Sequence, residues 1–235
     1  MTKPDGDSST YATIVVSGPD AASFLQGQLT LDIQSLAEGD PPVLAAWCNP
    51  KGRVIALFRI RLADGAYRLA LPEELAEPVV KRLTLFRFRS KVDLETAALL
   101  PADLGRGDGE SLPAWRERQF AAGIADIGEA QSEEFTPHML NLDLLDAISF
   151  EKGCYTGQEI VARTHYRGAT RRRMLRYGAT VNAVPGDKLM LDERPVGEVV
   201  NVLGAEILAV APLDNSAAGL TVNGGSLEPL ELPYL

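Results

Sequence analysis

Cysteine and histidine, the usual ligands of zinc and iron–sulfur clusters, are scarce in this sequence. Its 235 residues include two cysteines, Cys48 and Cys154, and two histidines, His138 and His165. No Cys-x-x-Cys pair is present, and the four residues occur in unrelated contexts. Structural zinc sites and resident iron–sulfur clusters need several such ligands at characteristic spacings. We therefore expect no resident metal.

Long apolar segments are also lacking. No run of about 18 apolar residues occurs, which is the length expected of a membrane-spanning helix. The first residues, Met1 to Gly6, lack the apolar stretch of a secretory signal peptide. The sequence therefore predicts a soluble, reduced, cytoplasmic protein without a membrane partner.

Positive charge is in short supply. The chain has 23 Lys and Arg against 32 Asp and Glu, which gives a net charge of −9. This balance argues against general affinity for nucleic acids or anionic membranes. The hydrophobic content of 46% is ample for a core and excludes a disordered chain. The length allows one large domain or two modest ones.

The first hundred residues alternate apolar runs with turn signals, which indicates an α+β domain. Asn49-Pro50-Lys51-Gly52-Arg53 between two apolar runs is typical of a hairpin. Asp20 is placed to cap a short helix, and Pro78 raises the question of whether a second helix is continuous. The expected strands are 12–16, 43–48, 54–62, 66–71 and 91–96, and the expected helices are 20–26 and 73–86.

The rest of the chain changes character twice. Residues 101–114 are rich in Gly, Asp and Pro and predict a flexible connection. Helices are expected at 115–122 and from Thr136-Pro137 onward. Short strands at close spacing then predict a small β-barrel, so the expected domains are 1–168 and 169–235. The expected barrel segments are 174–181, 188–191, 194–203, 206–213 and 219–231.

The most informative segment is Lys152-Gly153-Cys154-Tyr155-Thr156-Gly157-Gln158-Glu159, with Arg163 after it. Thr156 and Glu159 have the spacing of a capping box, which predicts a helix from about Gly157. A thiol beside Lys152 and a helix N-terminus should have a lowered pKa. Glu159 and Arg163 are spaced to pair along the helix. The simpler alternative is a capped helix with a half-buried, inert cysteine and a surface ion pair.

This segment resembles the signature of the YgfZ family, whose members are folate-binding proteins implicated in iron–sulfur cluster assembly and repair. Their fold is shared with the glycine-cleavage T-protein, a tetrahydrofolate-dependent aminomethyltransferase. Four further segments resemble that family in the same order, namely 24–30, 48–53, 135–142 and 227–230. The resemblance implies a T-protein-like module with ferredoxin-like halves, the second one shortened, followed by a C-terminal β-barrel.

The same resemblance implies that a reduced folate, tetrahydrofolate or a derivative, binds without a covalent bond. Glu151 resembles the T-protein acid that holds the pterin. A carboxylate suits the adjacent N–H donors of a pterin, because it can accept two hydrogen bonds in one plane. Cys154 is a candidate reactive thiol toward an iron–sulfur client protein or assembly factor. Lys152 is a candidate for the folate glutamate tail or for steadying a thiolate. The other candidate cofactor-binding residues are Tyr155, Gln158, Glu159, Arg163, Asn141, Gln28 and Asn49.

Two departures from the resemblance bear on function. Only residues 97–134 separate the first sheet from the segment at Phe135, so the pocket should be more open or partly supplied by a second copy. Ala56 and Leu57 stand where the T-protein carries acidic residues, one of them catalytic. Aminomethyl transfer needs an acid or base near the folate, so its absence disfavours that activity.

A second class of function stays open. Arg171-Arg172-Arg173, with Arg167 and Lys152, forms a basic cluster in an acidic protein. It could receive a polyglutamate tail or an acidic partner, and a folate-independent adaptor would use it for docking. RNA binding is the weaker interpretation, because aromatic residues are not interleaved along the sequence as stacking platforms require.

Overall fold

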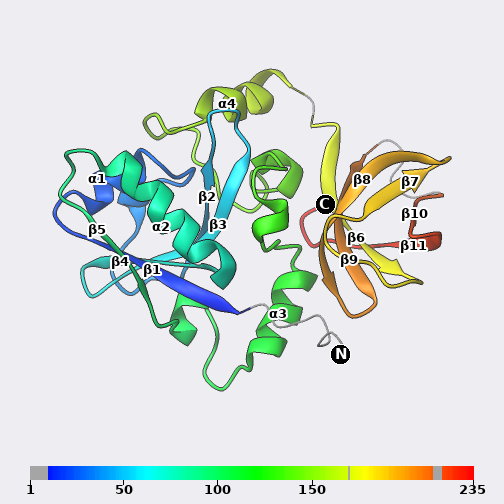
Figure 1. Ribbon diagram of the computed structural model, residues 1–235, viewed down its shortest axis with the longest axis horizontal. Coiled ribbons are helices and arrows are strands. Elements are labelled where there is room, and N and C mark those ends of the chain that lie inside the picture. Colours follow the sequence, from blue (N-terminus) through cyan, green and yellow to red (C-terminus); the bar gives the residue numbers. More distant parts are fainter. Residues whose placement is uncertain (1–9, 169, 214–218) are drawn as a thin grey trace.

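The computed structural model describes residues 10–168, 170–213 and 219–235. A five-stranded antiparallel sheet forms the first part, in the order β2-β3-β4-β1-β5 (Figure 1). Its strands are β1 (Tyr11–Ser17), β2 (Val43–Cys48), β3 (Val54–Ala63), β4 (Ala66–Pro72) and β5 (Asp93–Ala97). The α+β prediction and the hairpin at 49–53 are confirmed.

Two helices accompany this sheet, α1 (Ala21–Gln26) and α2 (Glu73–Arg87). α2 continues through Pro78, because Leu75, Val79 and Leu83 on either side are buried against the sheet and hold both halves in place. The predicted cap at Asp20 is wrong in detail. Its side chain accepts a hydrogen bond from Lys91 N at 2.7 Å and ties α1 to the approach to β5 instead.

Between β5 and the barrel, none of the described residues forms a strand. The shortened second half consists of 3-10 helices and two α-helices. Thr136 caps its 3-10 helix as predicted, by accepting a hydrogen bond from Met139 N. The elements are η1 (Ile33–Ser35), within the first part, and η2 (Pro101–Leu104), α3 (Leu112–Ala121), η3 (Glu129–Gln131), η4 (Pro137–Leu140) and α4 (Gln158–Arg167).

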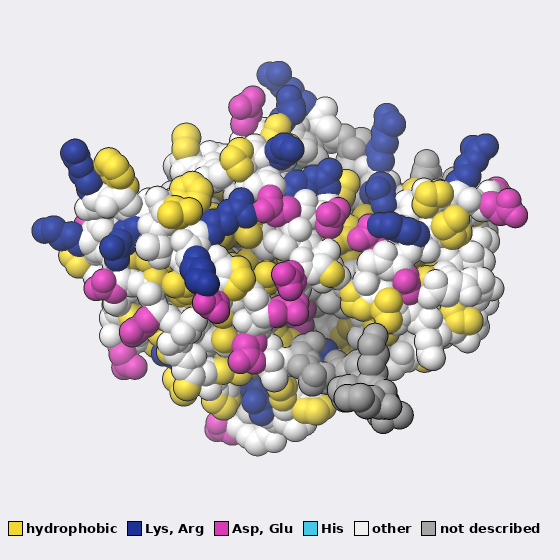
Figure 2. Space-filling model, in the orientation of Figure 1, with side chains coloured by type: hydrophobic (Ala, Val, Ile, Leu, Met, Phe, Trp, Pro, Cys, Tyr) yellow, Lys and Arg dark blue, Asp and Glu magenta, His cyan; other side chains and the backbone are white. Residues whose placement is uncertain are grey.

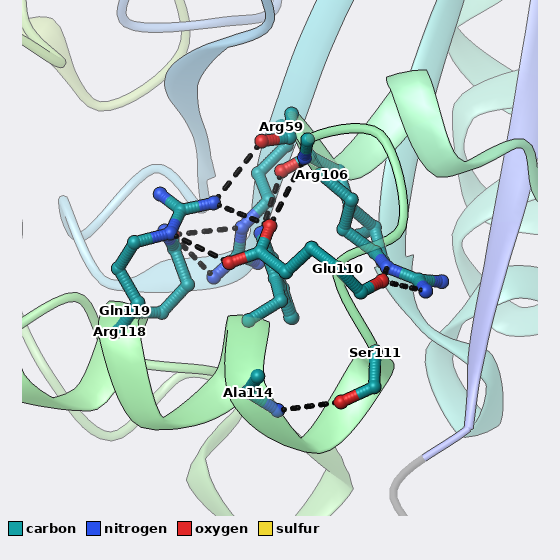
Figure 3. A network of polar contacts seen from close by, with 11 residues as sticks. Arg59, Arg106, Glu110, Ser111, Ala114, Arg118 and Gln119 are labelled. Atoms are coloured by element: carbon teal, nitrogen blue, oxygen red, sulfur yellow. Dashed lines mark hydrogen bonds and ion pairs between the residues drawn. The ribbon is translucent and has the colours of Figure 1, made fainter.

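The expectation of a flexible connection at 101–114 is wrong. Asp103 in η2 is fully buried and accepts hydrogen bonds from Arg61 and Arg68, both at 2.8–2.9 Å, and from Thr13. Further along, Arg106 and Arg118 converge on Glu110 in the polar network of Figure 3. These contacts, together with the burial of Leu104 and Trp115 against Tyr11 and Ala70, hold a polar, glycine-rich segment against the sheet.

Six strands close into a barrel in the order β10-β11-β6-β9-β8-β7, which confirms the predicted C-terminal barrel. They are β6 (Arg172–Ala179), β7 (Lys188–Leu191), β8 (Arg194–Leu203), β9 (Glu206–Pro212), β10 (Thr221–Val222) and β11 (Gly225–Leu230). The barrel has its own apolar interior around Tyr177, Leu189 and Val199.

Sheet and barrel also share one apolar core. Met174, Val200, Leu208 and Val210 belong to the same buried cluster as the sheet residues. Asn201 reinforces the junction, since it exchanges two hydrogen bonds of 2.9 Å with the backbone of Asp126. In the part of the chain that the structure describes, no helix is long and apolar enough to cross a membrane.

Candidate functional site

The loop at 149–157 lies between two segments from the N-terminal sheet. One is the stretch 26–31 after α1, and the other is the hairpin tip 48–53 between β2 and β3. Thr30 links the first of these by accepting a hydrogen bond from Ser149 N at 2.9 Å and donating one to Ala147 O at 2.7 Å. Three of the segments that carry the family resemblance, at 24–30, 48–53 and 152–159, therefore meet in space.

Lys152 fastens the loop to the stretch 26–31. Its side chain is buried, and Nζ donates to the backbone carbonyls of Gln26, Leu29 and Leu31 at 2.6, 2.7 and 2.8 Å. Burial lowers the pKa of Lys152 to about 8. The ammonium has three donors and all are used. The role considered from the sequence, a contact with a folate tail, is therefore replaced by a structural one.

Gly157 fastens the other end of the loop to the hairpin tip. It has φ +82°, and a Cβ placed there would lie 2.5 Å from Asn49 O and 3.1 Å from Gly52 Cα. Only glycine fits this conformation and approach. The helix consequently begins at Gln158 with Gly157 as its N-cap, so the predicted capping box at Thr156 is wrong.

Cys154 lies between these two fastenings and is exposed, as is Gly153 beside it. The next residue, Tyr155, is buried, and burial raises the pKa of its hydroxyl. Its ring also lies under the Lys152 ammonium, 5.2 Å from ring centroid to Nζ. The second cysteine, Cys48, is fully buried at the end of β2, where burial raises its pKa to about 12. The arrangement thus presents one thiol to solvent and hides the other.

Two of the predicted binding amides have structural roles. Asn49 Oδ1 accepts from the backbone N of Lys51 and Arg53 at 2.9 and 3.0 Å, and its amide donates to Glu133. Asn141 is fully buried and donates to Met174 O at 2.7 Å, at the junction with the barrel. Their polar atoms shape the hairpin tip and the junction, and a contact of either residue with a ligand stays a prediction.

The remaining predicted residues have polar side-chain groups without a partner among the residues that the structure describes. Glu151, Glu159 and Arg163 are exposed, and Gln158 is half-buried. Within the described ranges, no ion pair joins Glu159 to Arg163, so that predicted pair is absent. Gln28 lies inside the stretch held by Lys152, and its Oε1 is buried without a hydrogen-bond partner.

A ring cluster next to the loop was not anticipated. His138 is 2% exposed, and neither ring nitrogen has a hydrogen-bond partner. Burial lowers the pKa of His138, whereas the nearby charge of Asp143 acts to raise it. His165 stacks on Phe150 with centroids 3.8 Å apart, and His138 lies 6.2 Å from His165. Isolated histidines and one phenylalanine gave no signal in the sequence for this association.

The structure is similar to a solved aminomethyltransferase. The glycine cleavage system aminomethyltransferase T from Bartonella henselae superposes with a TM-score of 0.73 and 16% sequence identity, covering 97% of this chain and 84% of that one. This likeness defines the class of the fold, which is that of the glycine-cleavage T-proteins, as the sequence predicted.

Several curated proteins are similar to this chain in sequence. No family model matches the chain. Proteins named tRNA-modifying protein YgfZ from Vibrio atlanticus and Klebsiella pneumoniae are 28% and 29% identical, over 94% and 93% of this chain and 84% of each relative. An uncharacterized protein from Haemophilus influenzae is 32% identical over 70% of this chain and 69% of its own length. The chain is therefore similar, over most of its length, to proteins named YgfZ, in line with the resemblance seen in the sequence.

Proposed function

We propose that this protein binds a reduced folate and supports the assembly or repair of iron–sulfur clusters in client enzymes. The observation that carries the proposal is the placement of Cys154. Its thiol stands at the surface of a T-protein-like fold, on a loop fastened at Lys152 on one side and at Gly157 on the other. A thiol held in this way can meet a partner while the surrounding backbone stays fixed.

The residues around the loop fit a folate in part. The buried, unpartnered Oε1 of Gln28 is an acceptor suited to an N–H donor such as those of a pterin. Glu151 and Gln158 have unused polar groups, and Tyr155 supplies an aromatic ring. These four residues would hold the folate. When bound, it would supply a reduced pterin that can carry one-carbon units.

The role of Cys154 in this proposal is contact with a client. A thiolate can ligate iron or attack a sulfur species, whereas the thiol cannot do either efficiently. The cluster or sulfur species would be cargo held by the client rather than a resident group. We expect the loop to hold the thiol in a fixed orientation. We expect the folate-binding residues to control how easily a client reaches it.

One-carbon transfer is the competing enzymatic function. Ala56 and Leu57 both lie buried in β3, within the apolar core. Neither can exchange a proton, which disfavours aminomethyl transfer through this position. Formation of a one-carbon product from a methylamine donor and tetrahydrofolate would revive that function.

The test is an anaerobic calorimetric titration with tetrahydrofolate. Micromolar binding by the wild type, weakened about tenfold or more in Glu151→Ala and Gln28→Leu, would support the site. Glu193→Ala, an exposed acid in the barrel, is the control and should bind like the wild type. Lack of binding to well-folded wild-type protein would exclude the folate. Client maturation unaffected by Cys154→Ala would exclude the thiol.

A further inference from the structure

The segment that follows the Cys154 loop differs in charge from the rest of the chain. Residues 160–186 contain no Asp or Glu, although the whole chain has a net charge of −9. The same residues include six arginines, so a strongly positive stretch lies within an acidic protein. These are Arg163, Arg167, Arg171, Arg172, Arg173 and Arg176.

Two of the six form ion pairs within the fold, and a third is partly buried. Arg173 forms a two-pronged ion pair with Asp143 at 2.9 and 2.8 Å, and Arg176 pairs with Glu206 at 2.7 Å. Arg172 is half-buried, with its Nε enclosed and unpartnered. These three side chains are therefore poorly placed to meet a partner.

The other three arginines are free at the surface. Arg163, Arg167 and Arg171 are exposed, and none forms an ion pair with a residue that the structure describes. Arg163, Tyr166 and Arg167 follow the i, i+3, i+4 spacing that places side chains on one face of a helix. Glu159, one turn earlier, is the acidic residue on that face. In Figure 2, dark-blue side chains gather along the upper edge, where Figure 1 draws α4.

Aromatic rings lie among these charges. Tyr166 is 68% exposed, which is unusual for so large a ring, and contacts Phe150 and His165 edge-on at centroid distances of 6.0 and 4.9 Å. His165 is exposed as well and stacks on Phe150. Tyr166 thus stands between Arg163 and Arg167, contrary to the expectation that no aromatic residue is interleaved with the arginines, and Phe150 packs beside it.

We propose that the α4 surface, formed by Arg163, Tyr166 and Arg167 of α4 and by Arg171 four residues after the helix, binds a single-stranded nucleic acid. The three guanidinium groups receive backbone phosphates. The exposed ring of Tyr166 receives an unstacked base. An acidic peptide would use the arginines alone, and a duplex keeps its bases stacked away from the rings. This inference is independent of the folate proposal.

The test is fluorescence anisotropy of labelled oligonucleotides of about 12 nucleotides, a length within known single-strand site sizes. RNA and DNA of mixed sequence are titrated at several salt concentrations without folate. We expect binding whose log–log salt slope is about −2, as about three phosphate contacts predict. Replacing Arg163, Arg167 and Arg171 together by Gln should bring the salt slope close to zero. Tyr166→Ala should weaken binding roughly tenfold, while Tyr166→Phe should preserve it.

A matched control separates this surface from general electrostatics. Replacing the exposed Arg89, Lys91 and Arg194 together by Gln removes the same charge elsewhere and should leave most of the affinity. Equal losses in the two triple variants would overturn the proposal. So would equal binding of duplex, full competition by polyglutamate at equal charge, or an absence of binding at low salt. A preference for RNA or for DNA would support it and identify the source of the ligand.

Discussion

The Nζ atom of Lys152 donates a 2.7 Å hydrogen bond to the backbone carbonyl of Leu29, across 123 residues of sequence. With the bonds to Gln26 and Leu31, one side chain satisfies the last carbonyl of α1 and two carbonyls beyond it. Because Lys152 lies two residues before Cys154 in the same loop, the position of the thiol depends on a contact with the N-terminal part of the chain.

We predict that Lys152→Met destabilises the protein by about 2–3 kcal/mol, since it leaves enclosed carbonyls without donors. Urea unfolding measures this change. Lys152→Arg should not restore stability, because a planar guanidinium cannot reproduce three converging bonds from one nitrogen. Lys91→Met, at an exposed lysine, serves as the control. A loss below about 0.5 kcal/mol for Lys152→Met would contradict the structural role.

Gly157→Ala should cost about 1–3 kcal/mol or more, because the new methyl group meets Asn49 O in a left-handed backbone conformation. The matched control is Gly153→Ala in the same loop, where nothing lies within 4 Å of the added atom. Its effect should stay within about 0.5 kcal/mol. Chemical denaturation of both variants tests the difference, and equal costs would show that the hairpin does not constrain the loop.

Asp103→Asn should cost about 3–5 kcal/mol, because it leaves Arg61 and Arg68 facing an uncharged partner. Asp108→Asn, at an exposed position in the same segment, is the control.

The pH dependence of stability should also reveal Asp103. Burial alone would raise its pKa, but hydrogen bonds from Arg68, Leu100 N, Thr13 and Arg61 outweigh burial and lower it. The folded-state pKa thus lies below the unfolded one. The carboxylate consequently stabilises the fold above its ordinary pKa of 3.8, and that contribution is lost as pH falls below it. Acid unfolding curves for Asp103→Asn should be flatter than for wild type, and parallel curves would refute the assignment.

The two thiols should differ sharply in reactivity. Under native conditions a thiol reagent should modify Cys154 rapidly, while Cys48 reacts more than about a hundredfold slower because it is buried with its pKa raised to about 12. Denaturation should release the second thiol. Cys154→Ser should remove the fast phase completely, and a persistent fast phase would mean that Cys48 becomes accessible in the folded state.

Local patterns in the sequence foretold much of the fold. The turn residues at 49–53 join two consecutive strands, and the short strands after Arg172 follow one another closely along the chain, so their meaning does not depend on distant partners. Asp103 illustrates the opposite case. It stands in a segment with the composition of a linker, and its partners Arg61 and Arg68 come from two strands of the sheet.

The candidate site shows the same limit more clearly. The family resemblance singled out Lys152 and Asn141, but nothing local indicates that their polar atoms form hydrogen bonds with groups far away in the chain. The ring cluster likewise depends on Phe150 and His165 approaching through the fold. Identity of side chains could be taken from the sequence, whereas their availability to a ligand required the structure.

The apolar core that runs from the sheet into the barrel has a consequence for chain integrity. Met174 and Val210 are buried with side chains of the first part, so the two parts hold each other through packing as well as through the covalent link. A single cut between α4 and β6 should therefore yield two fragments that co-elute as one particle and separate only when the shared core melts.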